Sequence, residues 1–280
     1  FKGLLMADLR ILSLGAGVQS STLALMIEGG EIPMVDAAIF ADTMGEPKVV
    51  YTHLNWLEKQ LSYPVYKVKW RNLKQDIFNA SIGKYKGFTA PFYTQNPKTR
   101  KKGMLRRQCT ADYKIKPVIK KIRELLGYKK GEKVKKSIKV ELLMGISIDE
   151  VMRMRINKMK YITNIYPLID SKLSRHDCLN WIKKNNYPKP PRSACTFCPF
   201  HSKIEWLEIK KNKEEWNEVV DMDHAIRQQE KFKKNKDGSA FFQDKLYLHR
   251  SCVPISEVNF NEDNNQLNLF NNECEGYCGN

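Results

Sequence analysis

Short apolar runs alternate with segments of helical spacing over the first half of the chain. Leu9–Leu14 has the length and character of a buried strand, whereas Val49–Leu61 places its apolar residues near helical spacing. The predicted strands are Leu9–Leu14, Asp36–Phe40, Val65–Val68 and Val140–Met144, and the predicted helices are Ser20–Glu28, Val49–Leu61 and Ile115–Leu126. This alternation predicts an α/β fold with a parallel sheet flanked by helices, and ligands bind such sheets at the carboxyl ends of the strands.

The rest of the chain has a different pattern. Gly83–Gly103 is rich in Gly, Pro and Lys and predicts a long loop. From Ser171 onward the pattern is mostly helical and rich in loops, and Leu246–Leu248 is strand-like. We therefore expect an α/β domain over residues 8–170 and a helical, cysteine-bearing region over residues 171–280. No stretch approaches the ~18–20 apolar residues of a membrane span, so we expect a cytoplasmic protein without a membrane partner.

Positive charge is concentrated in one window of the sequence. The 280 residues contain 48 Lys and Arg against 31 Asp and Glu, a net charge of +17. Residues 98–139 alone hold 17 cations and three acids, a net +14. Such a field attracts polyanions. It fits a nucleic acid or a small multiply charged nucleotide, and a solvated lysine-rich face remains the alternative.

The seven cysteines are odd in number, which does not fit a disulfide framework in an intracellular protein. Cys195 and Cys198 form a CxxC pair, a spacing that suits a metal or a redox dithiol. Cys274 and Cys278 stand near the end of the chain. Cys178 falls in the predicted helix Ser174–Lys184, where we expect it to pack rather than bind a ligand.

A glycine turn joins the first strand to the first helix. Gly15-Ala16-Gly17 lies between them, an arrangement that directs backbone N–H groups and a helix dipole at an anion. The hydroxyls of Ser13, Ser20 and Ser21 add donors. A tight turn that binds no ligand can have the same sequence. Other motifs must therefore distinguish an anion-binding turn from a purely structural one.

This turn belongs to the first of six motifs that follow one another along the chain. They are Ser13-Leu14-Gly15-Ala16-Gly17-Val18-Gln19-Ser20-Ser21, Asp42-Thr43 with Glu46, Arg107-Gln108-Cys109-Thr110 with Lys114-Ile115-Lys116-Pro117, Gly145-Ile146 with Asp149-Glu150 and Arg153, Pro167-Leu168 with Trp181 and the CxxC pair, and Glu273-Cys274 with Cys278-Gly279. Together they resemble the PP-loop ATPase superfamily, and most closely its phosphoadenosine phosphosulfate (PAPS) reductase-like family. Val18 stands where the ATPase branches carry Lys, and Gln19 is the residue of the reductase branch. Thr110 replaces a second Cys.

The resemblance implies an adenine nucleotide alpha hydrolase-like fold that binds ATP or PAPS. The implied nucleotide-binding residues are Ser13, Gly15, Gly17, Gln19, Ser20, Ser21, Asp42, Gly145 and Arg153. Without the loop Lys, charge neutralisation falls to Arg106, Arg107, Lys114, Arg153 or Arg155, of which we favour Arg107, Lys114 and Arg153. Asp42 is expected to accept from a ribose, to hold Mg²⁺ or to cap a helix, and Asp149 and Glu150 to bind Mg²⁺ or pair with Arg153.

The resemblance also implies a 4Fe-4S cluster on Cys109, Cys195 and Cys198. Clusters take four Cys thiolates as a rule, and Thr110 removes one. The fourth ligand is then Cys252, Cys274 or Cys278, or one iron stays open. Structural Zn²⁺, with His201 as the nearest histidine, and no metal at all are the alternatives.

Two enzymatic functions and one non-enzymatic function remain open. The first is ATP-dependent sulfur transfer, or a related modification, of a nucleic acid (tRNA or DNA). The second is a sulfonucleotide reductase in which Cys274 or Cys278 attacks the sulfur of PAPS or its unphosphorylated analogue and releases sulfite. Thioredoxin or another sulfur or electron donor would then be a partner. Arg107 and Lys114 join the tail cysteines as catalytic candidates, and the third reading is a basic nucleic-acid-binding protein without activity.

Overall fold

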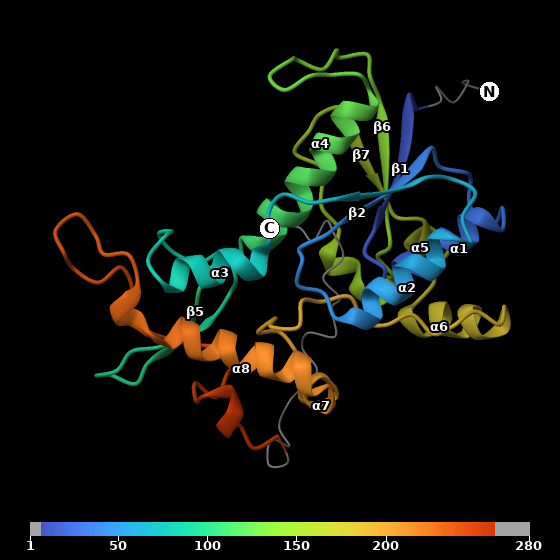
Figure 1. The fold of residues 1–280 in the computed structure, drawn as a ribbon. Coiled ribbons are helices and arrows are strands. Elements are labelled where there is room, and N and C mark those ends of the chain that lie inside the picture. The colour runs from blue at the N-terminus through green and yellow to red at the C-terminus, as the bar shows by residue number, and fades with distance from the viewer. Residues whose placement is uncertain (1–6, 261–280) are drawn as a thin grey trace.

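Strand β1 (Leu9–Leu14) lies at the centre of a five-stranded parallel sheet whose order is β3-β2-β1-β6-β7 (Figure 1). The computed structural model that shows this sheet describes residues 7–260. The other strands are β2 (Ala37–Ala41), β3 (Val65–Val68), β6 (Val140–Met144) and β7 (Ile162–Ile165). Leu12 pairs with Ala38 on one side and with Leu143 on the other. The predicted parallel sheet is therefore confirmed, with four of its strands at the expected places.

Alternate residues of β1 face two separate layers of helices. The first hydrophobic core surrounds this sheet and has one layer on each face. Leu12 and Leu14 belong to one layer, and Ile11 belongs to the other. This follows from the period of two along a strand. Both faces are covered, which explains why the strands are continuous apolar runs.

Helices cover both faces of the sheet. The first face carries α1 (Val18–Glu28), α2 (Lys48–Glu58), α5 (Pro167–Asp170) and α6 (Arg175–Lys184). The second face carries α4 (Lys116–Leu125), which continues directly from a π-helix over Thr110–Ile115. Short 3₁₀ helices span Ile148–Arg153, Gln229–Lys231 and Ile255–Glu257.

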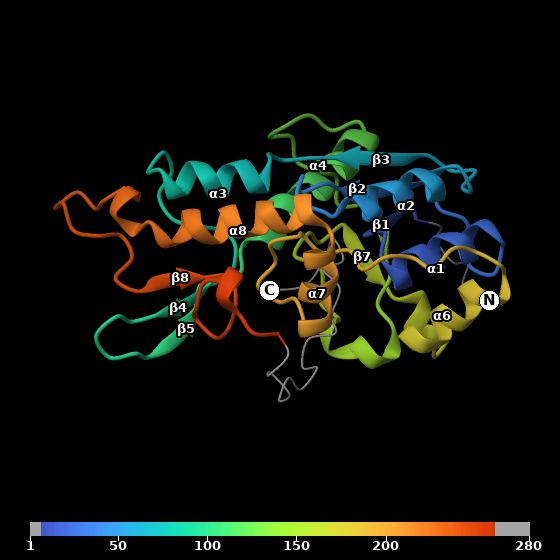
Figure 2. The ribbon, with the colours of Figure 1, turned by 60° about the horizontal axis from the view of Figure 1, so that its bottom comes forward.

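A second hydrophobic core is built from segments far apart in the sequence. It involves α3 (Leu73–Ser81), α7 (Lys203–Lys211), α8 (Lys213–Arg227) and a three-stranded antiparallel sheet of order β5-β4-β8. These strands are β4 (Tyr93–Gln95), β5 (Lys102–Met104) and β8 (Lys245–Tyr247). Figure 2 shows α3 and α8 side by side above this sheet. Its core is rich in aromatic residues, among them the fully buried Phe92 and Trp206.

Four elements differ from the sequence expectation. The long loop predicted over Gly83–Gly103 contains β4 and leads into β5, and α3 and β7 were not predicted. β4 pairs with β8, so its strand character depends on a partner about 150 residues away in the chain. The local sequence shows only the turn residues of the hairpin.

The expected division of the chain at residue 170 stays a prediction, and the hydrophobic cores do not follow it. α6 packs against α1, and its Cys178 is fully buried in the first core, in agreement with the packing role expected of it. Conversely, α3 and the β4–β5 hairpin precede residue 170 in the chain but pack in the second core. Within residues 7–260, no helix combines the length and apolar character needed to cross a membrane.

Candidate functional site

The turn after β1 leads directly into the N-terminus of α1. Ala16 has a φ of 59°, in the left-handed region, and Gly17 is the N-cap residue. The backbone N–H of Gly15 donates to Ser20 Oγ at 3.2 Å, which closes the turn. Because the first turn of α1 holds no acidic residue, the helix itself does not offset the positive end of its dipole. This is an arrangement that suits an anion.

The hydroxyl side chains of this turn are buried. Ser13, Ser20 and Ser21 are each at most 2% exposed. Ser21 Oγ lies 2.9 Å from His53 Nε2 on α2. Burial lowers the pKa of His53 to about 4, so the imidazole is neutral near pH 7. The contact therefore fixes Ser21 without adding a charge to the turn.

Gln19 connects the turn to the carboxyl end of β6. Its amide nitrogen donates to Ser147 Oγ at 3.3 Å and to Glu150 Oε2 at 3.1 Å, and its oxygen accepts from Arg175 Nη1 at 2.8 Å. Glu150 also pairs with Arg153 at 2.6 Å in a buried ion pair. The expected ion pair of Glu150 with Arg153 is thus present, while the Mg²⁺ alternative stays a prediction. Two guanidinium groups lie beside the turn.

Asp42 follows β2 and accepts hydrogen bonds within its own segment. Its Oδ1 accepts from the backbone N–H of Met44 at 2.7 Å and from Tyr51 Oη at 2.8 Å. Helix α2 begins at Lys48 with Pro47 as its N-cap, so Asp42 does not cap this helix. Its expected role toward ribose or Mg²⁺ stays a prediction.

Glu46 and Lys114 form a buried ion pair next to this segment. Lys114 Nζ lies 3.2 Å from Glu46 Oε1, and the two side chains are 4% and 0% exposed. Ser193 Oγ donates to the other carboxylate oxygen at 3.3 Å. The pair therefore joins three segments, namely the loop after β2, the π-helix and the residues that precede Cys195. π-Helical turns are rare and occur frequently at functional sites.

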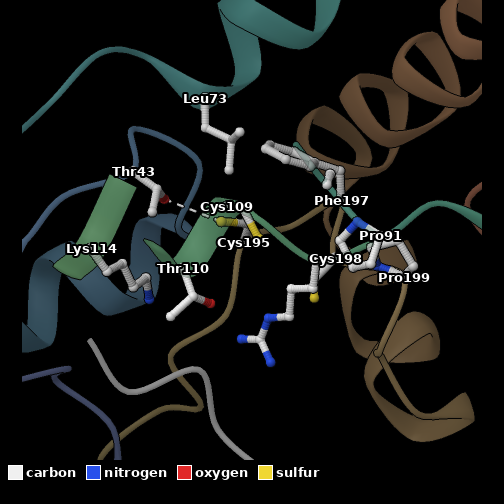
Figure 3. Close-up of a pocket in the computed structure, with 12 residues that line it drawn as sticks. Thr43, Leu73, Pro91, Cys109, Thr110, Lys114, Cys195, Phe197, Cys198 and Pro199 are labelled. Atoms are coloured by element: carbon white, nitrogen blue, oxygen red, sulfur yellow. Dashed lines mark hydrogen bonds between the residues drawn. The ribbon is translucent and has the colours of Figure 1, made fainter. Parts of the chain in front are cut away.

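Three of the predicted cysteines line one pocket, together with Arg107 and Lys114 (Figure 3). Cys109 directly precedes the π-helix, and Cys195 and Cys198 form a turn closed by the Cys198 N–H donating to the Cys195 carbonyl at 2.9 Å. Thr43 Oγ1 lies 3.1 Å from Cys195 Sγ. Two distant segments thus bring their thiols to the carboxyl end of β2.

The three thiols line the same pocket but are not arranged as the ligands of a metal ion. In the described part of the chain, no group of three or more His, Cys, Asp or Glu side chains is arranged to hold a metal ion. Burial raises the pKa of the Cys195 thiol well above its usual value, and Glu46 raises it further, while Lys114 lowers it. Burial likewise lowers the pKa of His201 to about 3, and its Nε2 lies 2.8 Å from the Cys195 carbonyl. The neutral imidazole of His201 therefore binds the backbone of the cysteine turn.

Gly45 allows the loop after β2 to touch the cysteine turn. A Cβ at this position would lie 2.8 Å from the ring of Phe197, closer than real Cβ contacts. The Thr196 N–H donates to the Gly45 carbonyl at 2.8 Å. The absence of a side chain at Gly45 thus leaves room for the Phe197 ring.

The remaining predicted residues occupy different places. Gly145 is buried directly after β6, near Gln19's partner Ser147. Cys252 is buried with its thiol 3.8 Å from the Thr94 carbonyl, and it does not line the pocket of the other three cysteines. Cys274 and Cys278 lie outside the described residues, so their roles stay predictions.

Sequence reasoning missed Arg175, the first residue of α6. Its guanidinium contacts Gln19, and its backbone N–H donates to Asp149 Oδ1 at 3.0 Å. The available signal was the capping box of α6, Ser174 with Asp177, which fixes where this helix begins. That signal places Arg175 in the first turn but does not reveal which loop it faces.

The comparisons with known proteins give a likeness among solved structures only. No protein-family model and no curated protein matches the chain. Among solved structures, it is similar to phosphoadenylyl-sulfate (PAPS) reductase from Candida auris in its phosphate complex, with a TM-score of 0.42 and 14% identity. The match covers 67% of this chain and 78% of that one.

Breaking the buried ion pair should destabilise the protein strongly. We expect Lys114→Met to lower the free energy of unfolding by about 3–5 kcal/mol, because Glu46 would be left charged and unpaired. The double variant Lys114→Met/Glu46→Leu should recover much of this loss. Urea unfolding measures both. Lys116→Met, which removes the exposed partner of Asp112, is the control and should cost less than about 1 kcal/mol. Equal losses in the two single variants would contradict the assignment.

His53 should make stability depend on pH. Its folded pKa lies below the unfolded value, so the unfolded chain binds more protons, and stability falls as pH drops from 6.5 to about 4. The full contribution is about 3 kcal/mol. We expect His53→Gln to flatten this part of the profile, measured as unfolding free energy against pH. Exposed His176, changed to Gln, is the control. A profile unchanged in His53→Gln would show that the imidazole is not buried neutral.

Proposed function

We propose that this protein is an enzyme of the PAPS reductase-like PP-loop type, which binds an adenine nucleotide and transfers sulfur to a nucleic acid. One observation carries the proposal, namely that Cys109, Cys195 and Cys198 line a single pocket beside Lys114 and Arg107. Thiols supply sulfur chemistry, and Arg107 suits an anionic substrate, whereas the charge of Lys114 is offset by Glu46. The motif resemblance agrees with this combination.

The nucleotide half of the site is built at the carboxyl ends of β1, β2 and β6. Phosphates would accept hydrogen bonds from the turn Gly15–Gly17 at the N-terminus of α1. Arg153 and Arg175 lie beside Gln19 and supply the charge that a loop Lys gives in the ATPase branches. Asp42, which ends the neighbouring strand, is the candidate for the ribose.

The cysteine half fits an iron–sulfur cluster by the chemistry of its donors. The candidates are three thiols without a carboxylate among them, a set that soft metals and Fe–S clusters prefer. Cys109, Cys195 and Cys198 would hold the cluster, and a fourth ligand would come from Cys274, which lies outside the described residues. When bound, the cluster would supply a sulfur-binding or redox-active iron.

The proposed reaction would then proceed in two steps. A base carbonyl oxygen attacks the α-phosphorus of ATP, the bond to pyrophosphate breaks, and the turn after β1 holds the leaving pyrophosphate. The terminal sulfur of a persulfide donor, R–S–SH, next adds to the carbon of that carbonyl and displaces AMP, which leaves a base–S–S–R disulfide. A second thiol then attacks the sulfur attached to R, so that the base keeps one sulfur and the two thiols leave as a disulfide. Arg107 lines the pocket over the ring of Phe200, with 5.5 Å between its Cζ and the ring centre, where it can stabilise the anion.

Two neighbouring arginines offer a matched test of this chemistry. We expect Arg107→Gln to lower the rate of pyrophosphate release from ATP by about 10- to 100-fold, the effect of losing one charged hydrogen bond. Arg106→Gln is the control, because Arg106 is exposed and does not line the pocket. The assay contains tRNA or single-stranded DNA and a persulfide donor. Sulfite release from PAPS without pyrophosphate release from ATP would favour the reductase reaction instead.

The cluster is tested separately by anaerobic purification with iron and sulfide analysis. We expect the wild-type protein to contain iron and acid-labile sulfide, and Cys109→Ser, Cys195→Ser and Cys198→Ser each to lose most of both. Cys178→Ala is the control, since Cys178 is buried in the first core away from the pocket. Zinc without iron in the wild-type preparation would refute the cluster.

A further inference from the structure

The basic window of residues 98–139 does not form one surface in the structure. Its first part lies in the β4–β5 hairpin, its middle part forms the π-helix and α4, and its last part is the loop before β6. Figure 1 shows α4 extending from the region of the π-helix toward that loop. The charge is therefore spread over distinct elements, and only a part of it lines a common hollow.

That hollow is a groove along α4, which we call the α4 groove. Five cations line it and only one carboxylate, Glu124. The cations are Lys116, Lys120, Arg123, Lys129 and Lys130. Arg123 donates to the carbonyls of Lys129 and Glu132 and so ties the loop to the helix. Arg123, one of the five cations, is thus held in place by the fold.

An exposed aromatic residue also lines the α4 groove. Trp70 follows β3, and its side chain is 51% exposed, which is unusual for so large an apolar group. Leu73, three residues later, lines the cysteine pocket. Trp70 is therefore close in sequence to a residue of the candidate active site.

We propose that the α4 groove binds a single-stranded segment of nucleic acid, with phosphates against its cations and one base stacked on Trp70. This inference rests on the proposed function, for which it supplies the substrate surface. Phosphates bind Lys and Arg, and an unpaired base stacks on an aromatic face, which a duplex does not offer. Ten residues of α4 span ~15 Å, roughly the length of four stacked nucleotides.

Trp70 variants test the stacking contact. Binding of a fluorescein-labelled oligo(dT) and oligo(U) of equal length to the full chain is measured by anisotropy, without ATP. We expect Trp70→Ala to weaken binding about 10-fold or more, and Trp70→Phe to keep most of the affinity. A duplex of the same length should bind more weakly than either single strand. Unchanged affinity in Trp70→Ala, or equal affinity for the duplex, would overturn the proposal.

Salt dependence tests the cations. We expect Lys120→Gln/Lys129→Gln to reduce the slope of log affinity against log salt by about 0.7 for each lost phosphate contact. The control is Lys183→Gln/Lys184→Gln at the exposed end of α6, which removes the same charge elsewhere. Equal slopes in the two double variants would contradict the groove as the binding surface.

The two proposals fail in different ways. Groove binding is read without turnover, so a lack of pyrophosphate release alongside Trp70-dependent binding would remove the proposed reaction and keep the groove. Turnover that is stimulated by nucleic acid but insensitive to Trp70 and Lys120 would keep the reaction and remove the groove.

Discussion

The buried ion pair of Glu46 and Lys114 is the contact on which the geometry of the candidate site depends. A carboxylate without exposure must be paired, since an isolated buried charge costs several kcal/mol. Lys114 meets this need only while the π-helix lies against the loop after β2, and Ser193 binds the same carboxylate from the cysteine-bearing segment. One electrostatic requirement thus brings together the segments that carry Cys109 and Cys195.

The two hydrophobic cores complete this placement. Tyr113 of the π-helix and Phe197 of the CxxC turn are buried in the second core, and Cys109 and Cys195 pack against it. The loop after β2, in contrast, extends from a strand of the central sheet. The cysteine pocket therefore lies where the two cores meet, a usual place for ligand sites. The turn after β1 and the cysteine pocket lie at the carboxyl ends of the neighbouring strands β1 and β2.

Local patterns were enough to predict the first strand, the glycine turn and α1, because each is determined by neighbouring residues. The resemblance to the PAPS reductase-like family, and not a local pattern, implied that Cys109 and the CxxC pair belong to one site, and all three line one pocket. Local patterns could not predict that β4 pairs with β8, since the pairing of Thr94 with Leu246 joins distant parts of the chain. For the same reason, Arg175 was missed as a partner of Gln19. The expected role of Gln19 toward a nucleotide stays a prediction, and its side chain binds Ser147, Glu150 and Arg175.

The proximity of Cys109 to Cys195 is the central claim and can be measured directly. A chain in which Cys109 and Cys195 are the only cysteines would be treated, folded and free of metal, with a short thiol-to-thiol cross-linker, and the peptides analysed by mass spectrometry. The account predicts an intramolecular link between the two residues in the folded chain. A link that forms only after unfolding, or none at all, would contradict it.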